Sequence, residues 1–178
     1  MRKLSFALLM VCAFAVSASA QMKLSGKETF GKPDTMQSVD VGDKPGHALM
    51  IAKGSSTWNP GFEILGLKAV SSVFASTSEG WGSNFTEHGY DTVTMDDGDT
   101  ITAKYSGTIT VAKDGSMTFH GTWTFASATG KLQGVSGSGT YGGTAAADGT
   151  GSTDVRGTYT AAKPTMKVVP AAKPAPAS

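Results

Sequence analysis

The stretch from Asp99 to Thr160 constrains the fold more than any other part of this chain, because polar and apolar residues alternate along several successive segments. A period of two is typical of a half-buried β-strand, whose side chains point alternately to the two faces of a sheet. One face of the first segment carries Ile101, Ala103, Tyr105, Gly107, Ile109 and Val111, whereas the other carries Thr102, Lys104, Ser106, Thr108 and Thr110. The second segment places Met117, Phe119, Gly121, Trp123 and Phe125 on its apolar face.

Turn signals separate these segments. Asp96-Asp97-Gly98 precedes the first segment, and Lys113-Asp114-Gly115 joins it to the second, so the sequence predicts a β-hairpin. A glycine-rich strand is expected from about Leu132 to Tyr141, and a last strand alternates from 155 to 161. Glycine inside a strand marks a bend, a bulge or a close approach of backbones, which a coiled sheet needs in order to close.

The first half of the chain alternates less regularly. Strands are expected near 23–30, 47–53, 70–77 and 90–95. Residues 62–74 include apolar side chains at both even and odd positions, so this segment holds either a helical turn or a strand that is buried on both faces. We favour a strand that begins near Lys68. Together these segments predict an all-β fold, a closed antiparallel eight-stranded barrel, with a two-sheet sandwich as the alternative.

The two ends of the chain differ from this pattern. Residues 1–20 have a basic start, an apolar run and the sequence Ala18-Ser19-Ala20, which predict a secretory signal peptide cleaved after Ala20 and a periplasmic or extracellular protein. The β-barrel domain is expected over 21–162. Residues 163–178 are rich in proline, alanine and lysine, so a disordered tail is expected there, with a tether to an envelope polymer as the alternative.

Composition excludes several classes of function. The only cysteine, Cys12, lies within the predicted signal peptide, so no disulfide, thiolate nucleophile or cysteine-bound zinc is expected in the mature chain. The chain has 15 Lys and Arg against 14 Asp and Glu, without a basic block, which argues against nucleic acid as a partner. No segment after the signal is apolar enough to predict a membrane span. Motifs for cofactor binding are absent, and no cofactor is expected.

The glycine-rich region resembles a known family. The phrases GDTITAKYSGT, GTWTFASATGKLQGVSGSGTY and VRGTYT are similar to those of secreted bacterial proteins of the allene oxide cyclase-like, or dirigent-like, β-barrel group. The resemblance covers about 97–160 and implies a barrel in which plant members bind small apolar molecules and steer their cyclisation or coupling. It implies no functional residue here, because the similar motif concerns the fold. Barrels of this group can associate through their outer faces, so an oligomer is compatible with the resemblance.

The inward face of the predicted barrel is the candidate ligand site. An eight-stranded barrel is wide enough either to be filled by side chains or to hold one small ligand. Alternation also directs Ile109 and Val135 inward, and a packed core is the alternative interpretation of the whole set. The residues expected to bind a small apolar ligand are Tyr105, Met117, Phe119, Trp123, Phe125, Tyr141 and Tyr159.

Three glutamates are candidate general acids or bases, because a carboxyl inside an apolar barrel has a raised pKa and can exchange protons with a ligand. They are Glu63, Glu79 and Glu87, and Glu63 is favoured because Phe62 and Ile64 flank it. No metal site is predicted: the spacing of His47, His88 and His120 matches no ligand motif, and His120 falls on the polar face of its strand. The acidic turn at 96–99 lacks the further ligands of a calcium loop.

Three functions follow from these observations. The first is a periplasmic or secreted barrel that binds a small apolar molecule in its interior. The second is an isomerase or cyclase that holds an apolar substrate in a productive shape. The third is an envelope interaction protein that contacts a polymer through its tail or its outer threonine face.

Overall fold

The computed structural model describes residues 20–161, which fold into ten β-strands and one short 3-10 helix. The predicted tail and all of the predicted signal peptide except Ala20 lie outside these residues. Within residues 20–161 no helix has the length and apolar character needed to cross a membrane. The strands are β1 (Met22–Phe30), β2 (Thr35–Asp40), β3 (His47–Trp58), β4 (Glu63–Ile64), β5 (Leu67–Trp81), β6 (Asn84–Met95), β7 (Thr100–Val111), β8 (Met117–Ala128), β9 (Ser136–Ala145) and β10 (Gly151–Thr160), with helix η1 (Gly130–Leu132) between β8 and β9.

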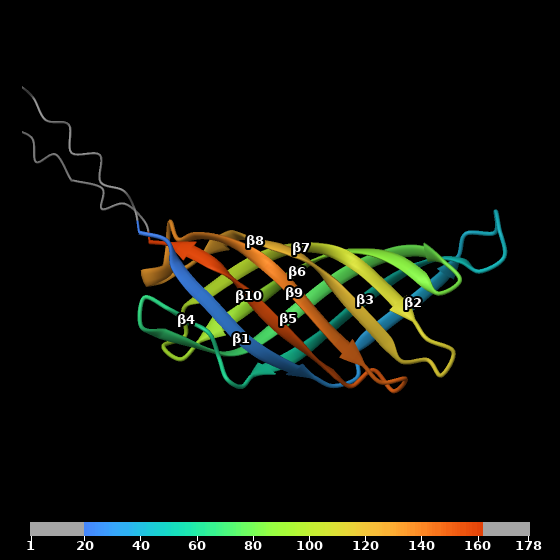
Figure 1. Ribbon diagram of the computed structural model, residues 1–178, viewed down its shortest axis with the longest axis horizontal. Coiled ribbons are helices and arrows are strands. Elements are labelled where there is room, and N and C mark those ends of the chain that lie inside the picture. Colours follow the sequence, from blue (N-terminus) through green and yellow to red (C-terminus); the bar gives the residue numbers. More distant parts are fainter. Residues whose placement is uncertain (1–19, 162–178) are drawn as a thin grey trace, which may run out of the picture.

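Eight of the strands close into an antiparallel barrel, as the alternation predicts. Strands β5 to β10 pair in chain order, β10 pairs with β1, and β1 pairs with β3. Pairing of β3 with β5 over eleven residue pairs closes the ring. Strand β2 lies beside β3 where β1 has ended, so β1 and β2 form one interrupted edge of β3. Figure 1 shows the barrel from the side, with β4 at one end and the β7–β8 and β9–β10 turns at the other.

Asp-Gly pairs form three of the tight turns. In each pair the glycine has a positive φ, between 84° and 92°, which costs glycine little because it has no Cβ. The aspartate carboxylate accepts a hydrogen bond from the backbone N–H two residues later, at 2.9–3.0 Å, and so fixes the turn. The three pairs are Asp97-Gly98, Asp114-Gly115 and Asp148-Gly149.

Glycines on the inner wall lie beneath aromatic rings. A Cβ added at Gly143 would lie 2.6 Å from the ring of Phe119, and one added at Gly157 would lie 2.5 Å from the ring of Trp123. The rings therefore lie flat on the wall where a neighbouring strand has no side chain, an arrangement known to stabilise glycines in sheets. The same relation joins Gly26 to Trp58, Gly54 to Phe74, Gly89 to Tyr105, Gly137 to Phe125 and Gly151 to Phe30, whereas Gly121 lies beside the hydroxyl of Tyr141.

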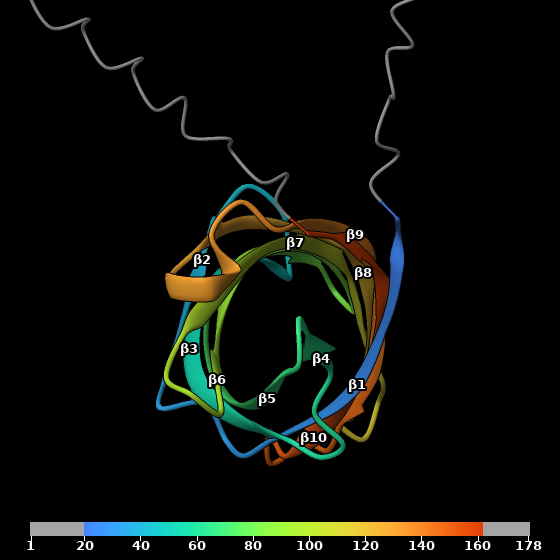
Figure 2. The same cartoon turned by 90° about the vertical axis from the view of Figure 1, so that its left-hand side faces the viewer.

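The main hydrophobic core occupies one end of the barrel. Strand β4 folds back into this end, where Figure 2 shows it within the ring of strands. Ile64 of β4 is fully buried, and the N–H of Leu65 donates a hydrogen bond to the Tyr159 hydroxyl at 3.2 Å. Helix η1 covers the same end through Leu132. The cluster consists of Leu24, Trp58, Phe62, Ile64, Leu67, Ala69, Val93, Met95, Ile101, Trp123, Leu132, Val135 and Tyr159.

Replacing Ile64 by alanine should lower the free energy of unfolding by about 3 kcal/mol, because the change removes a fully buried aliphatic side chain from this core. Urea denaturation followed by tryptophan fluorescence measures the effect. Glu63→Ala is the matched control, since Glu63 is the exposed neighbour on the same strand and should change stability by less than about 0.5 kcal/mol. Equal stabilities of the two variants would show that β4 does not contribute to the core.

The structure differs from the sequence prediction in four strands, of which the two-residue β4 was not predicted. Strand β2 was not predicted, because all six of its residues are exposed and give no alternating pattern of burial. The strand expected from Leu132 begins only at Ser136, since η1 and a turn at Gly134 occupy the preceding residues. The strand expected near 90–95 is longer than predicted, since β6 begins at Asn84 and includes His88.

Candidate functional site

A layer of polar side chains crosses the middle of the barrel, next to the apolar core. All of its members occupy inward positions, where alternation would place apolar residues in an ordinary barrel. We call it the polar layer and define it as Glu28, Ser56, Ser72, Glu87, Asp91, Tyr105 and Tyr141. The inward positions of the described strands contain no Lys, Arg or His, so the three carboxyls of this layer face no basic side chain across the interior.

Glu28 is held by two serines of neighbouring strands. Its side chain is 8 % exposed, and its Oε1 atom accepts a hydrogen bond from Ser72 Oγ at 2.9 Å and another from Ser56 Oγ. The two serine oxygens lie 2.6 Å apart, and Trp58 Nε1 donates to Ser72 Oγ at 3.3 Å. Strands β1, β3 and β5 thus contribute to one connected network around this carboxyl.

Asp91 has a carboxylate oxygen without a partner. The residue as a whole keeps some exposure, but its Oδ1 atom is buried and makes no hydrogen bond within residues 20–161. An unpaired buried polar atom is uncommon in folded proteins and costs about 1–3 kcal/mol. Burial, with a further contribution from the charge of Glu28, raises the pKa of Asp91 to about 8.

Glu87 and two tyrosines complete the layer on the opposite wall. The Tyr141 hydroxyl donates a hydrogen bond to Glu87 Oε1 at 2.7 Å, and the rings of Tyr105 and Tyr141 meet edge to face with centroids 5.6 Å apart. Tyr105 lies over Gly89, which separates Glu87 from Asp91 along β6. Its ring is therefore close to both carboxyls of that strand.

Burial also raises the pKa values of Glu28 and Glu87 above the ordinary value for glutamate. Hydrogen bonds from Ser56 and Ser72 oppose this effect at Glu28, and the bond from Tyr141 opposes it at Glu87. The pKa values of both tyrosines are raised as well, mainly by burial and further by the charge of Glu87. The layer therefore retains protons that the same groups would lose in water.

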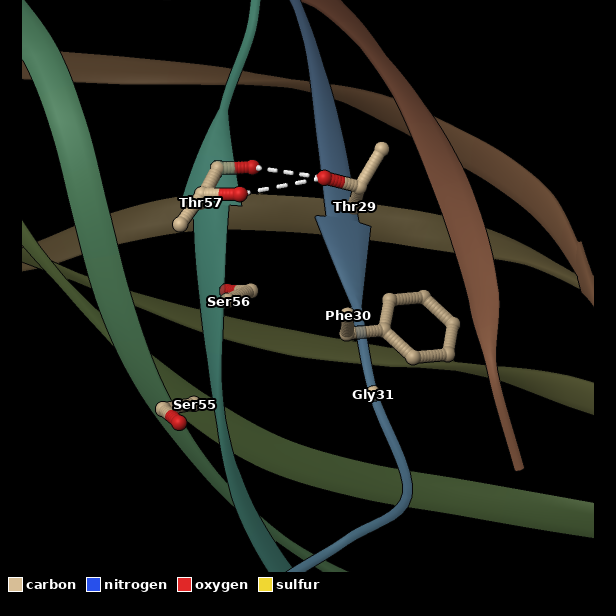
Figure 3. Close-up of a pocket in the computed structure, with 6 residues that line it drawn as sticks. All are labelled: Thr29, Phe30, Gly31, Ser55, Ser56 and Thr57. Atoms are coloured by element: carbon tan, nitrogen blue, oxygen red, sulfur yellow. Dashed lines mark hydrogen bonds between the residues drawn. The ribbon is translucent and has the colours of Figure 1, made fainter. Parts of the chain in front are cut away.

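A pocket of about 270 Å³ opens in the barrel wall beside this layer, where β1 ends and β2 has not yet begun. Figure 3 shows β1 and β3 diverging at this point. The pocket is an open depression, and it borders the polar layer because Ser56 belongs both to its lining and to the hydrogen-bond network of Glu28. Its lining consists of Thr29, Phe30, Gly31, Ser55, Ser56 and Thr57.

Beyond the polar layer, away from the core, the inward side chains are less deeply buried than in the core. Phe30, Phe74 and Phe119 occupy inward positions there but keep intermediate exposure. The ring of Phe30 lies 6.4 Å from that of Phe74 and 6.1 Å from that of Phe119, centroid to centroid. These rings form an apolar region next to the carboxyls and beside the wall pocket.

The structure distributes the predicted ligand-binding residues over three regions. Tyr105 and Tyr141 belong to the polar layer, whereas Trp123 and Tyr159 are buried in the core. Phe125 packs against that core, with its ring over Gly137. The remaining two, Met117 and Phe119, lie inward near the opposite end of the barrel.

Of the three glutamates that the sequence suggested, only Glu87 lies inside the barrel. Glu63, the favoured one, is exposed on β4, and Glu79 faces outward on β5. Sequence reasoning missed Glu28 and Asp91. Each lies an even number of residues from a buried apolar residue of its strand, Glu28 from Leu24 and Asp91 from Val93. The alternation therefore already predicted that both side chains point inward.

The three histidines lie apart, on the outer face. His47 is buried on the outside of β3, where its Nδ1 contacts Asp43 Oδ1 at 2.5 Å and its Nε2 contacts Glu79 Oε1 at 3.1 Å. These hydrogen bonds raise the pKa of His47 against the opposing effect of burial, and Trp81 stacks on its ring with centroids 4.1 Å apart. Among residues 20–161, no three His, Cys, Asp or Glu side chains converge in a way that could hold a metal ion.

Comparisons of this chain with protein-family models, with curated proteins and with solved structures found no match. The barrel and its polar layer therefore provide the basis for a functional assignment.

Proposed function

We propose that the protein binds one small molecule inside its barrel, between the polar layer and the half-exposed phenylalanines. The observation that carries the proposal is the buried, unpaired Oδ1 atom of Asp91 in a barrel whose inward Phe30, Phe74 and Phe119 remain partly exposed. Binding sites typically combine apolar walls with a few polar groups that orient the ligand. The apolar rings of Phe30, Phe74 and Phe119 would hold the body of the ligand, and Asp91 would bond its polar group.

The wall pocket is the proposed way in. It has an opening bounded by Gly31 and Ser55, and its inner side includes Ser56 of the polar layer. The proposal keeps the periplasm or the cell exterior as the place of action, on the basis of the signal-like residues 1–20. It also retains the resemblance to allene oxide cyclase-like barrels as a prediction about ancestry.

Blocking the pocket tests the proposal. Gly31→Trp introduces a large side chain where an added Cβ meets no atom within 4 Å and φ is not positive, so the variant should fold normally. Gly142→Trp is the matched control, since Gly142 lies outward on β9 and its nearest atom would be 3.7 Å away. The probes are 2-phenylethanol and 2-phenylethylamine, which are small enough for the pocket, and saturation-transfer NMR measures their binding.

At least one probe should bind wild type and Gly142→Trp but bind Gly31→Trp about tenfold more weakly, because the new indole would fill the opening. Binding that is equal in all three proteins would place the probe elsewhere and contradict the proposal. Failure of both probes to bind wild type would contradict it as well.

A second function, proton transfer within a bound molecule, is favoured by the pairing of Glu28 with Asp91. Two interacting carboxyls with raised pKa values supply one group that can donate a proton and another that can accept one. An isomerase of this kind would exchange carbon-bound hydrogen of a ligand with solvent. Deuterium uptake from D2O by a molecule that copurifies with the protein, lost in Asp91→Asn, would distinguish it from a binding protein.

A further inference from the structure

We propose that the ligand of the barrel carries a positive charge and is an organic ammonium ion, whose charged group lies between Asp91 and the two tyrosines of the polar layer. The inference rests on the proposed interior site and specifies the chemistry of its ligand. It follows from the arrangement of charge and aromatic rings around that site.

The ionisable side chains that face the interior from the described strands are all acidic, and none is basic. Glu28 faces it from β1, and Glu87 and Asp91 face it from β6. Strands β3 and β5 contribute the neutral hydroxyls of Ser56 and Ser72, whereas β7 and β9 contribute tyrosines. His88 is the basic residue nearest in sequence to Glu87, and it faces outward from β6. A cation inside the barrel would therefore meet carboxyls and no competing base from any strand that faces it.

The hydrogen bonds of the polar layer leave one buried acceptor oxygen available to a hydrogen-bond donor. Glu28 Oε1 already accepts hydrogen bonds from Ser56 and Ser72, and Glu87 Oε1 accepts one from Tyr141. Asp91 Oδ1 accepts none. An ammonium group carries donors only, so it satisfies this oxygen and gains the greater strength of a charge-assisted hydrogen bond.

Aromatic rings surround the same position. Tyr105 lies over Gly89 between the two carboxyls of β6, and Tyr141 meets it edge to face. The negative face of an aromatic ring attracts an ammonium group, and carboxylates together with tyrosine rings form a common setting for organic cations. An inorganic divalent ion fits less well, because in residues 20–161 no three acidic or histidine side chains converge on one point.

A pair of probes with the same ring and chain length tests the charge. The amino group of 2-phenylethylamine is protonated at neutral pH, whereas 2-phenylethanol carries a hydroxyl in the same place. Isothermal titration calorimetry at pH 7.5 should show wild type binding the amine at least about tenfold more tightly than the alcohol. In Asp91→Asn the amine should lose most of this advantage while the alcohol binds about as before.

The affinity for the amine should also rise as the pH increases from 6 to 8, because ionisation of Asp91 strengthens the attraction, and the alcohol should show no such trend. Asp154→Asn serves as the control, since Asp154 is exposed on the outer face of β10. Glu87→Gln provides a second interior variant and should weaken amine binding by a smaller factor.

The outcomes separate the two proposals. If both probes bind with equal affinity and Gly31→Trp blocks both, the interior site stands and the charge inference is overturned. The charge inference is also overturned if the amine preference survives in both Asp91→Asn and Glu87→Gln. If neither probe binds wild type, both proposals fail.

Discussion

Asp91→Asn is expected to raise the free energy of unfolding by about 2 kcal/mol at pH 8.5, even though the change removes a carboxyl group of the proposed site. At this pH the wild-type protein holds a negative charge in the barrel interior, close to Glu28 and without a basic partner. Asparagine has a similar shape and no charge, so it removes this cost.

The sign of the pH dependence follows from the raised pKa. The ordinary pKa of an aspartate is 3.8, whereas that of Asp91 in the folded protein is about 8, so between these pH values the folded protein binds a proton that the unfolded chain has released. Stability from this group is fully present below about pH 4 and is lost as the pH rises toward 8. The advantage of Asp91→Asn should therefore be large at pH 8.5 and small at pH 4.

Urea denaturation at the two pH values, followed by tryptophan fluorescence, measures both effects. Asp154→Asn should shift stability by less than about 0.5 kcal/mol at either pH, because its carboxylate is exposed to solvent on β10. An Asp91→Asn protein that is less stable than wild type at pH 8.5, or equally stabilised at both pH values, would show that Asp91 is not a buried, costly charge.

A second large effect is expected from adjacent glycines of β9 that face opposite sides of the barrel wall. Gly143→Ala should lower the free energy of unfolding by about 2–3 kcal/mol, because its Cβ would lie 2.1 Å from the backbone oxygen of Ser152 and 2.6 Å from the ring of Phe119. The ring can rotate, but the backbone oxygen belongs to the paired strand β10 and cannot move without disturbing the ladder.

Gly142→Ala is the control. Its Cβ would face outward with the nearest atom at 3.7 Å, and loss of glycine reduces the conformational entropy of the unfolded chain. This variant should match wild type or be more stable by about 0.5 kcal/mol. Thermal unfolding followed by circular dichroism compares the two proteins, and similar melting temperatures would contradict the proposed packing of rings on the wall.

Alternation predicted the strands and the inward aromatic residues of the second half because each of these strands has one buried and one exposed face. Strand β2 escaped prediction for the opposite reason: it lies at the rim beside β3, and all its residues are exposed. The core at one end could be predicted only in part, since it depends on β4 folding back into the barrel, a contact between distant segments.

The interior carboxyls were misjudged for a physical reason that applies to any strand. Glu63 attracted attention because Phe62 and Ile64 flank it, yet the immediate neighbours of a strand residue point to the opposite face. The residues two positions away share its environment. Glu28 follows Leu24 and Gly26 on one face, and Asp91 precedes Val93 and Met95, so both carboxyls belong to inward rows.

The confinement of the main core to one end implies that the barrel wall is not equally stable along its length. Amide hydrogens near Leu24, Trp58 and Met95 should exchange with solvent only on global unfolding, whereas those near the β7–β8 and β9–β10 turns at the other end should exchange through local openings. The polar layer lies at the boundary between these two regimes. For the proposed interior site, transient separation of β1 from β3 beside Gly31 would admit a ligand. The core at the β4 end would keep the barrel closed during this opening.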